Sequence, residues 1–163
     1  MGTDKGLIIK DDLPWFLHIG NLIESLGLPV YYSIRSEQLD SYKKYVDEEL
    51  LIIDDSISEG PLRGVLTALK ATNADALLVL ACDMQELQTP ALDLLLDAYE
   101  VIHYDFYAYN DGHYFLPFPA IYSRHGLEKM NEVKSLQQLL KQGNTCSLMM
   151  PGEEQFSNFN KLP

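Results

Sequence analysis

Cysteines and long apolar segments are both scarce in this sequence. Its 163 residues include only two cysteines, Cys82 and Cys146, too few for the disulfide framework that stabilises small secreted domains. The strongest apolar run, residues 76–82, is far shorter than the roughly 20 residues that cross a bilayer. The N-terminus does not resemble a signal peptide. We therefore expect a cytoplasmic protein in a reducing compartment, with no membrane-spanning segment.

Basic residues are also few. Lys and Arg number 12 against 24 Asp and Glu, which gives a formal net charge of −12. A field of this sign repels nucleic acid and anionic lipid, so we expect neither as a partner. A phosphorylated small molecule stays compatible with the sequence where local cations, backbone amides or a metal ion offset the negative field.

Apolar residues make up 47% of the chain, and a chain of this length buries roughly 70% of the surface that its unfolded state exposes. Apolar stripes at helical spacing alternate with short apolar runs. This alternation predicts an α/β fold, with a mostly parallel sheet covered by helices on both faces. A ligand then belongs beyond the carboxyl ends of the strands. No repeat or linker interrupts the chain, so we expect one domain over residues 1–163.

Apolar residues at helical spacing predict helices over residues 14–26, 62–71 and 89 onward. A polar stretch opened by Ser36 predicts another over residues 37–44, and a final helix is expected over residues 124–141. The expected strands are short and rich in Val, Ile, Leu and Tyr, and cover residues 29–34, 50–53, 76–82, 104–109 and 115–122. Asn110-Asp111-Gly112 predicts a hairpin turn between the last two. Thr89 followed by Pro90 predicts a capped helix start. A short segment over residues 156–160 completes the domain.

Acidic residues directly follow two of the expected strands. Asp83 comes after Leu-Leu-Val-Leu-Ala-Cys, and a carboxylate there can hold a hard cation against a phosphate; capping of the next turn explains the same residue equally well. Asp54 and Asp55 end another strand, ahead of a segment that contains Gly60 and Gly64. Free amides at a helix start, with glycines that permit close approach, can hold a nucleotide. Ordinary turn chemistry is the simpler explanation for that segment taken alone.

The sequence lacks the motifs of several other enzyme classes. The sequence contains no Gly-x-Ser-x-Gly, Walker loop or complete Gly-x-Gly-x-x-Gly, which disfavours hydrolases and dehydrogenases. Lys5 is the only cation ahead of Lys10, and a lysine so near a terminus is usually solvated. The aromatic cluster from Tyr104 to Tyr122 is expected to pack a sheet face. Metal-ligand spacing is absent among the four histidines His18, His103, His113 and His125.

Five short motifs occur in one order along the chain: Met-Gly-Thr-Asp-Lys-Gly (1–6), Asp-Asp-Ser (54–56), Gly-Pro-Leu-Arg-Gly (60–64), Ala-Cys-Asp-Met (81–84) and Phe-Ser-Asn-Phe-Asn (156–160). In order and spacing they resemble the molybdenum cofactor guanylyltransferases, the molybdopterin-guanine dinucleotide synthesis protein A family of the nucleotidyltransferase superfamily. The resemblance implies a Rossmann-like three-layer nucleotidyltransferase fold. It also implies transfer of GMP from GTP to molybdopterin, with release of pyrophosphate, in molybdenum cofactor biosynthesis.

The resemblance also implies roles for single residues. The lysine that matches Lys5 binds the nucleotide phosphates, the aspartate that matches Asp55 contacts the nucleotide, and the aspartate that matches Asp83 binds Mg²⁺. Lys5 and Asp83 are the expected catalytic residues, and Gly60 and Gly64 are expected beside the nucleotide. In-line attack on a phosphoryl group needs charge neutralisation and positioning rather than a covalent nucleophile. Molybdoenzymes or other cofactor-biosynthesis proteins are the expected protein partners.

The chain departs from the family pattern at its start. The family signature has a first strand and a Leu-Ala-Gly-Gly loop ahead of Arg-Met-Gly-x-Asp-Lys, and this sequence starts at the Met of that signature. We therefore expect the first strand and the main phosphate cradle to be absent, and a longer native protein if Met1 is an internal methionine. Ser33 stands where the family often has an Asn that contacts the nucleotide, and Leu116-Pro117 replaces a His-Pro pair. Asp83-Met84-Gln85 lacks the second Asp of glycosyltransferases with a related fold.

Two alternatives to guanylyl transfer stay open from the sequence alone. The first is another nucleotidyltransferase, which uses CTP with molybdopterin or acts on a sugar phosphate. The second is a catalytically inactive binding module without the phosphate loop.

Overall fold

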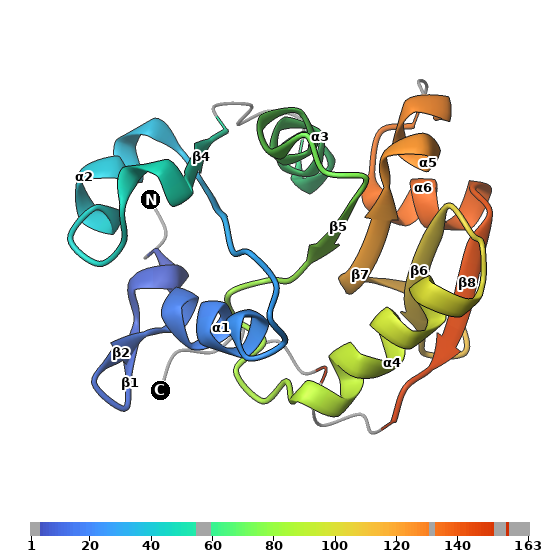
Figure 1. Cartoon of the computed structure of the whole chain (residues 1–163), viewed down its shortest axis with the longest axis horizontal. Coiled ribbons are helices and arrows are strands. Elements are labelled where there is room, and N and C mark those ends of the chain that lie inside the picture. The colour runs from blue at the N-terminus through green and yellow to red at the C-terminus, as the bar shows by residue number, and fades with distance from the viewer. Residues whose placement is uncertain (1–3, 55–59, 131–132, 152–155, 157–163) are drawn as a thin grey trace.

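The computed structural model describes residues 4–54, 60–130, 133–151 and 156. Its described residues combine helices with three sheets, two of two strands each toward the N-terminus and one of four strands toward the C-terminus (Figure 1). The first sheet is a hairpin of β1 (Ile9–Lys10) with β2 (Leu13–Pro14). The expected α/β class is confirmed. Within the described residues, no helix is long and apolar enough to cross a membrane.

The second sheet pairs β3 (Tyr32–Ile34) with β4 (Leu51–Ile53) in parallel, and Ser33 opposes Ile52 at its centre. Both strands are rich in β-branched or aromatic residues, which suit a pleated, half-buried surface. The helical elements of this half are η1 (Lys5–Leu7), α1 (Trp15–Glu24), η2 (Ser36–Gln38), α2 (Leu39–Tyr42) and η3 (Glu48–Leu50).

The third sheet has the strand order β5-β7-β6-β8. Its strands are β5 (Ala76–Val79), β6 (Phe106–Asn110), β7 (Phe115–Ser123) and β8 (Thr145–Met149). β7 is antiparallel to both β5 and β6, whereas β8 is parallel to β6, so three of the four strands share one direction. The helices of this half are α3 (Pro61–Thr72), α4 (Thr89–Val101), α5 (Arg124–Lys129) and α6 (Leu136–Gln142).

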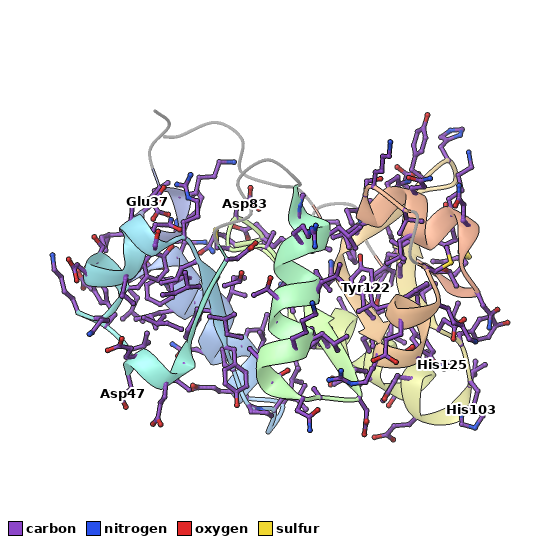
Figure 2. The ribbon with its side chains drawn as sticks, turned by 90° about the horizontal axis from the view of Figure 1, so that it is seen from above. Glu37, Asp47, Asp83, His103, Tyr122 and His125 are labelled. Carbon is purple, nitrogen blue, oxygen red and sulfur yellow. The ribbon has the colours of Figure 1, made fainter. Side chains whose placement is uncertain are left out.

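Alternation along β6 explains why helices cover both faces of this sheet. Phe106 belongs to a buried cluster with residues of α3, α5 and α6, whereas Tyr107 belongs to a second cluster with residues of α4. Tyr122 of β7 lies inside the first cluster, while His103 and His125 lie at the edge of the molecule (Figure 2). The prediction that the aromatic cluster packs a sheet is therefore confirmed.

The α4 face of the core provides a stability test. Leu95 is fully buried against this sheet, and Leu94 beside it is 43% exposed. Leu95→Ala removes packed methyl groups and leaves a cavity, so we expect the free energy of unfolding to fall by about 2–5 kcal/mol. Leu94→Ala, the matched control, should change it by no more than about 0.5 kcal/mol. Urea unfolding measures both, and equal effects would contradict this arrangement of α4.

The prediction of a single helix over residues 124–141 is wrong, because two helices occupy this range. α5 ends at Lys129, and Met130 leaves the helical conformation with φ −103° and ψ 67°. The Ser135 side chain then accepts a hydrogen bond from the Gln138 amide and starts α6 as a new helix, as an N-cap serine does. β8 was not predicted. Thr89 is the first residue of α4 rather than its N-cap, which is Gln88 without a side-chain bond.

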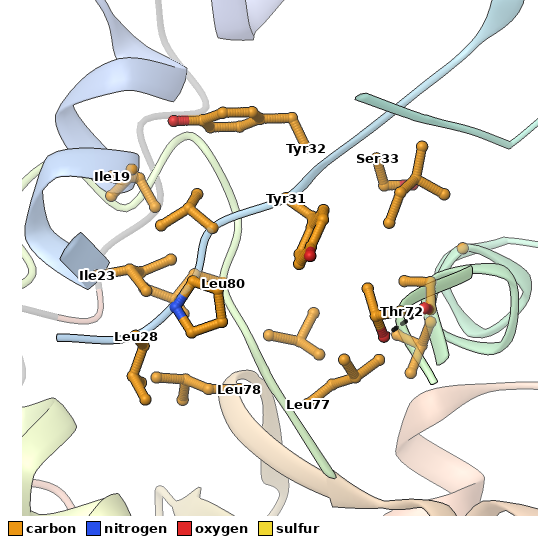
Figure 3. Close-up of a pocket in the computed structure, with 18 of the residues that line it drawn as sticks. Ile19, Ile23, Leu28, Tyr31, Tyr32, Ser33, Thr72, Leu77, Leu78 and Leu80 are labelled. Carbon is orange, nitrogen blue, oxygen red and sulfur yellow. Dashed lines mark hydrogen bonds between the residues drawn. The ribbon is translucent and has the colours of Figure 1, made fainter. Parts of the chain in front are cut away.

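The strands expected over residues 29–34 and 76–82 are shorter in the structure, because each pairs on one side only. Among the described strands, β3 pairs with β4 and β5 pairs with β7, but β3 and β5 do not pair with each other. A largely apolar cavity of about 560 Å³ separates them (Figure 3). Its walls come from β3, β5, α1 and α3, and include Ile19, Tyr31, Val65, Leu77 and Leu78.

Candidate functional site

The loop after β5 brings together two residues that are 78 positions apart in the sequence. Asp83 was expected directly after a strand, but it lies four residues beyond Val79, where β5 ends. Asp83 follows β5, and Lys5 belongs to η1. Lys5 Nζ lies 3.1 Å from Asp83 Oδ2, with side-chain exposures of 37% and 14%. The Asp83 label in Figure 2 marks the place. Because water is largely excluded from the carboxylate, this ion pair is stronger than an exposed one. The structure thus unites the two residues predicted to be catalytic.

The carboxyl end of β3 approaches the same region. Ile34, the last residue of β3, belongs to one apolar cluster with Phe16 and Tyr42, against which Cys82 packs. Ile34 and Cys82 therefore bring the ends of both strands to one side of the molecule. This is the side on which an α/β sheet binds its ligand.

The start of α3 forms the neighbouring wall. Gly60 precedes α3 with a positive φ of 71°, which favours glycine. A Cβ on Gly64 would lie 3.0 Å from Asp54 Oδ2 and 3.4 Å from Ser33 Oγ, so this glycine permits the close approach of α3 to the ends of β3 and β4. Asp55, predicted to contact the nucleotide, lies outside the described residues.

The thiol beside this pair is not a nucleophile. Burial, and then the negative charges of Asp83 and Asp4, raise the pKa of Cys82 to about 11. The thiol therefore stays protonated at neutral pH, and only a thiolate attacks. A charge pair beside a protonated thiol suits transfer by positioning and charge neutralisation.

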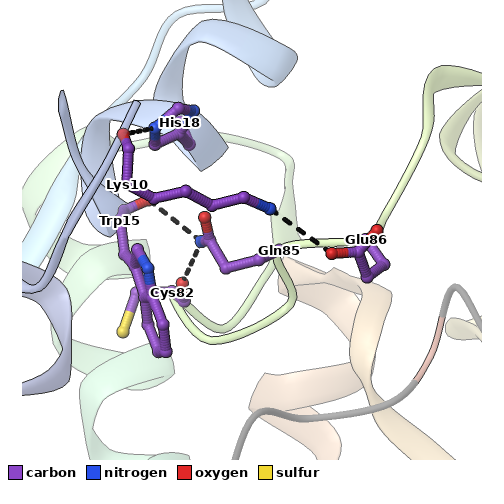
Figure 4. A network of polar contacts seen from close by, with 6 residues as sticks. All are labelled: Lys10, Trp15, His18, Cys82, Gln85 and Glu86. Atoms are coloured by element: carbon purple, nitrogen blue, oxygen red, sulfur yellow. Dashed lines mark hydrogen bonds and ion pairs between the residues drawn. The ribbon is translucent and has the colours of Figure 1, made fainter. Parts of the chain in front are cut away.

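Gln85 was missed in the sequence, yet it connects the loop that carries Asp83 to the N-terminal region. Its side-chain amide donates to the backbone oxygen of Cys82 at 2.6 Å and to that of Trp15 at 3.3 Å (Figure 4). Lys10 and Glu86 add an ion pair at 3.3 Å. The only feature of the sequence that pointed to Gln85 is its position two residues after Asp83. The sequence does not indicate that its side chain bonds to Cys82 and Trp15.

Asp83 can serve as a ligand for a hard metal ion. Among the described residues, no three or more His, Cys, Asp or Glu side chains gather in a way that could hold a metal. Mg²⁺ does not need such a group, because it typically binds one or two carboxylates, several waters and substrate phosphates. The single carboxylate of Asp83, in the loop after β5, fits this pattern, with the nucleotide expected to complete the ligand set.

Relatives with known names match the chain in sequence. A probable molybdenum cofactor guanylyltransferase of Methanothermobacter thermautotrophicus is 35% identical over 85 residues, which cover 51% of this chain and 43% of that protein. A molybdenum cofactor guanylyltransferase of Shewanella frigidimarina is 31% identical over 128 residues, which cover 76% of this chain and 62% of that protein. The chain thus spans about half the length of several curated relatives that it matches.

A solved structure and a family model agree with these matches. Molybdopterin-guanine dinucleotide biosynthesis protein A from Archaeoglobus fulgidus superposes with a TM-score of 0.69 at 18% identity, over 91% of this chain and 76% of that one. At this identity the likeness shows the shared fold. The family model described as "MobA-like NTP transferase domain" matches residues 1–146. Since this match covers most of the sequence, the chain belongs to the MobA-like NTP transferase domain family.

Proposed function

We propose that this protein transfers GMP from GTP to molybdopterin and releases pyrophosphate, as a step of molybdenum cofactor biosynthesis. The family supports nucleotidyl transfer, and the names of the relatives support the guanylyl group and the molybdenum cofactor. The single observation that carries the proposal is the contact of Lys5 with Asp83 in the loop that follows β5. It supplies a cation and a metal-binding carboxylate at one point of an otherwise acidic protein.

In this reaction an acceptor phosphate oxygen attacks the α-phosphorus of GTP, while the bond to pyrophosphate breaks. The Lys5 ammonium neutralises charge on the phosphate oxygens and helps to hold them in line. Asp83 is the residue that would hold Mg²⁺, and the ion, when bound, neutralises further charge on the phosphates. Gly64 lets α3 come close to the ends of β3 and β4, where Gly60 and Asp55 are proposed to complete the nucleotide site.

Transfer is proposed to require a strand between β3 and β5. The cavity there is largely apolar, and the strands on its two sides belong to different sheets. Open strand edges leave backbone N–H and C=O groups in need of partners, and an apolar strand would supply them and fill the cavity. The cavity therefore supports the proposal that a further strand lies between β3 and β5 in the active protein.

A nucleotide-transfer assay tests the proposal. The chain is compared with a version extended at its N-terminus by an apolar strand and a Leu-Ala-Gly-Gly loop, with GTP, CTP or UTP, Mg²⁺ and molybdopterin. We expect the extended protein to transfer GMP at least about tenfold faster than the chain alone. A preference for CTP would overturn the guanylyl assignment. If both proteins bind GTP but neither transfers GMP, the result would instead support the alternative of a catalytically inactive binding module.

The cysteines and the proposed reaction together suggest a cellular setting. We place it in the cytoplasm, on the basis of the two cysteines, which are both free. Molybdoenzymes or other cofactor-biosynthesis proteins are the proposed recipients of the product.

A further inference from the structure

We propose that Gln38 and Tyr42, at the two ends of the segment that forms α2, position Lys5 by holding the carboxylate of Asp4. This inference rests on the proposed role of Lys5 and extends it to residues outside the five sequence motifs that carry chemistry. Gln38 and Tyr42 are positioning residues, because they act on Lys5 through Asp4 and the backbone.

Both oxygens of the Asp4 carboxylate are engaged. Oδ1 accepts hydrogen bonds from the Gly6 amide at 3.0 Å and from the Tyr42 hydroxyl at 3.2 Å, and Oδ2 accepts one from Gln38 Nε2 at 2.5 Å. The bond to Gly6 caps η1, the element that contains Lys5. Since Asp4 directly precedes Lys5, these three bonds fix the backbone from which the lysine side chain extends toward Asp83.

Tyr42 is itself held rigidly. It is only 5% exposed, and its ring centroid lies 4.6 Å from that of Phe16. Burial, and then the negative charge of Asp4, raise the pKa of Tyr42, so the hydroxyl stays protonated and able to donate at any pH at which the protein works. A Cβ added to Gly6 would overlap the Tyr42 hydroxyl oxygen. The absence of a side chain at Gly6 is therefore what lets the η1 backbone lie against this tyrosine.

The arrangement implies that the hydroxyl of Tyr42 and its ring have separate tasks. The ring packs in the apolar cluster with Phe16 and Ile34, whereas the hydroxyl bonds to Asp4. Tyr42→Phe removes only the second. Tyr45→Phe is the matched control, because Tyr45 also meets the Phe16 ring, at a centroid distance of 5.9 Å, but is 46% exposed.

The first measurement addresses positioning without any nucleotide. Acylation of lysines by an amine-reactive ester is followed by mass spectrometry in the full chain and in both variants. We expect the rate at Lys5 to rise severalfold in Tyr42→Phe, because the ammonium is held less firmly against Asp83, and to be unchanged at Lys10 and in Tyr45→Phe. An unchanged rate at Lys5 in Tyr42→Phe would overturn the inference.

The second measurement addresses nucleotide binding by titration calorimetry with GTP and Mg²⁺. Loss of a hydrogen bond to a charged group costs about tenfold in an equilibrium constant, so Tyr42→Phe should weaken GTP binding by about that factor when Lys5 is present. In the double variant, Tyr42→Phe should cause no loss beyond that of Lys5→Ala alone. Equal losses in the two backgrounds would show a purely structural role and overturn the inference. If Lys5→Ala binds GTP normally while the acylation result holds, the proposed function fails and the positioning stands.

Discussion

In the N-terminally extended protein, Asp83→Asn is expected to lower the rate of Mg²⁺-dependent nucleotide transfer by about 1,000-fold. We expect the variant to keep its fold. The substitution preserves size but removes the charge that would hold the metal and that now pairs with Lys5 at 3.1 Å. The side chain is 14% exposed, so its charge acts where water screens it little. Steady-state transfer rates with GTP at several Mg²⁺ concentrations provide the measurement.

Glu86→Gln is the matched control for this change. Glu86 lies three positions further along the same loop, its side chain is 50% exposed, and it pairs with Lys10 rather than with Lys5. Its replacement should leave turnover within about twofold of the parent protein, since exposed ion pairs contribute little. Near-normal turnover of Asp83→Asn, with an unchanged thermal melting curve, would remove Asp83 from the metal role.

Lys5→Ala is the second change with a large expected effect. It removes the cation that the structure places beside the loop after β5, and we expect kcat/KM for GTP to fall by about 100-fold. The physical reason is that the net charge of −12 opposes the binding of a triphosphate unless a local cation offsets it. Initial rates at limiting GTP provide this value.

Lys10→Ala separates a local role of Lys5 from the general loss of one positive charge. Lys10 lies in β1, and its side chain is 40% exposed in a pair with Glu86. Both variants change the net charge equally, but only Lys5 contacts Asp83. Equal losses in the two variants would mean that Lys5 acts merely through the overall field and not at the phosphates.

Local patterning was sufficient for most of the helices. The stripe of Leu62, Val65 and Leu69 predicted α3, and these residues are buried against the sheet. The turn residues Asn110-Asp111-Gly112 predicted the hairpin of β6 and β7, and antiparallel pairing confirms it. In each case the signal and its structural consequence lie within a few residues of each other.

The errors have a common cause, which is that the deciding interaction is either a cap or a distant partner. Ser135 starts a separate helix by bonding to Gln138, although the apolar spacing runs on through it. β8 has mixed residues, and its pairing with β6 depends on a strand that lies about 40 positions earlier. β3 and β5 are short because of the neighbours that they lack among the described strands, which no local pattern reports.

At the candidate site, too, the sequence predicted local features but not the contacts between distant residues. The apolar run before Asp83 predicted a strand on the approach to its carboxylate, although β5 ends four residues earlier, at Val79. The family resemblance implied separate roles for Lys5 and Asp83, and their ion pair was not predicted. Gln38 and Tyr42 belong to none of the five motifs, and their bonds to Asp4 span 34 and 38 positions. Such contacts are set by the packing of α2 against η1 and cannot be obtained from periodicity.

The central claim is that Lys5 and Asp83 form the site at which the triphosphate binds. Its most direct test is an NMR titration of protein with isotope-labelled lysine side chains, using GTP and Mg²⁺. We expect the Lys5 ammonium signal to shift in proportion to bound nucleotide, while that of Lys10 stays in place. Saturable GTP binding with an unmoved Lys5 signal would contradict it.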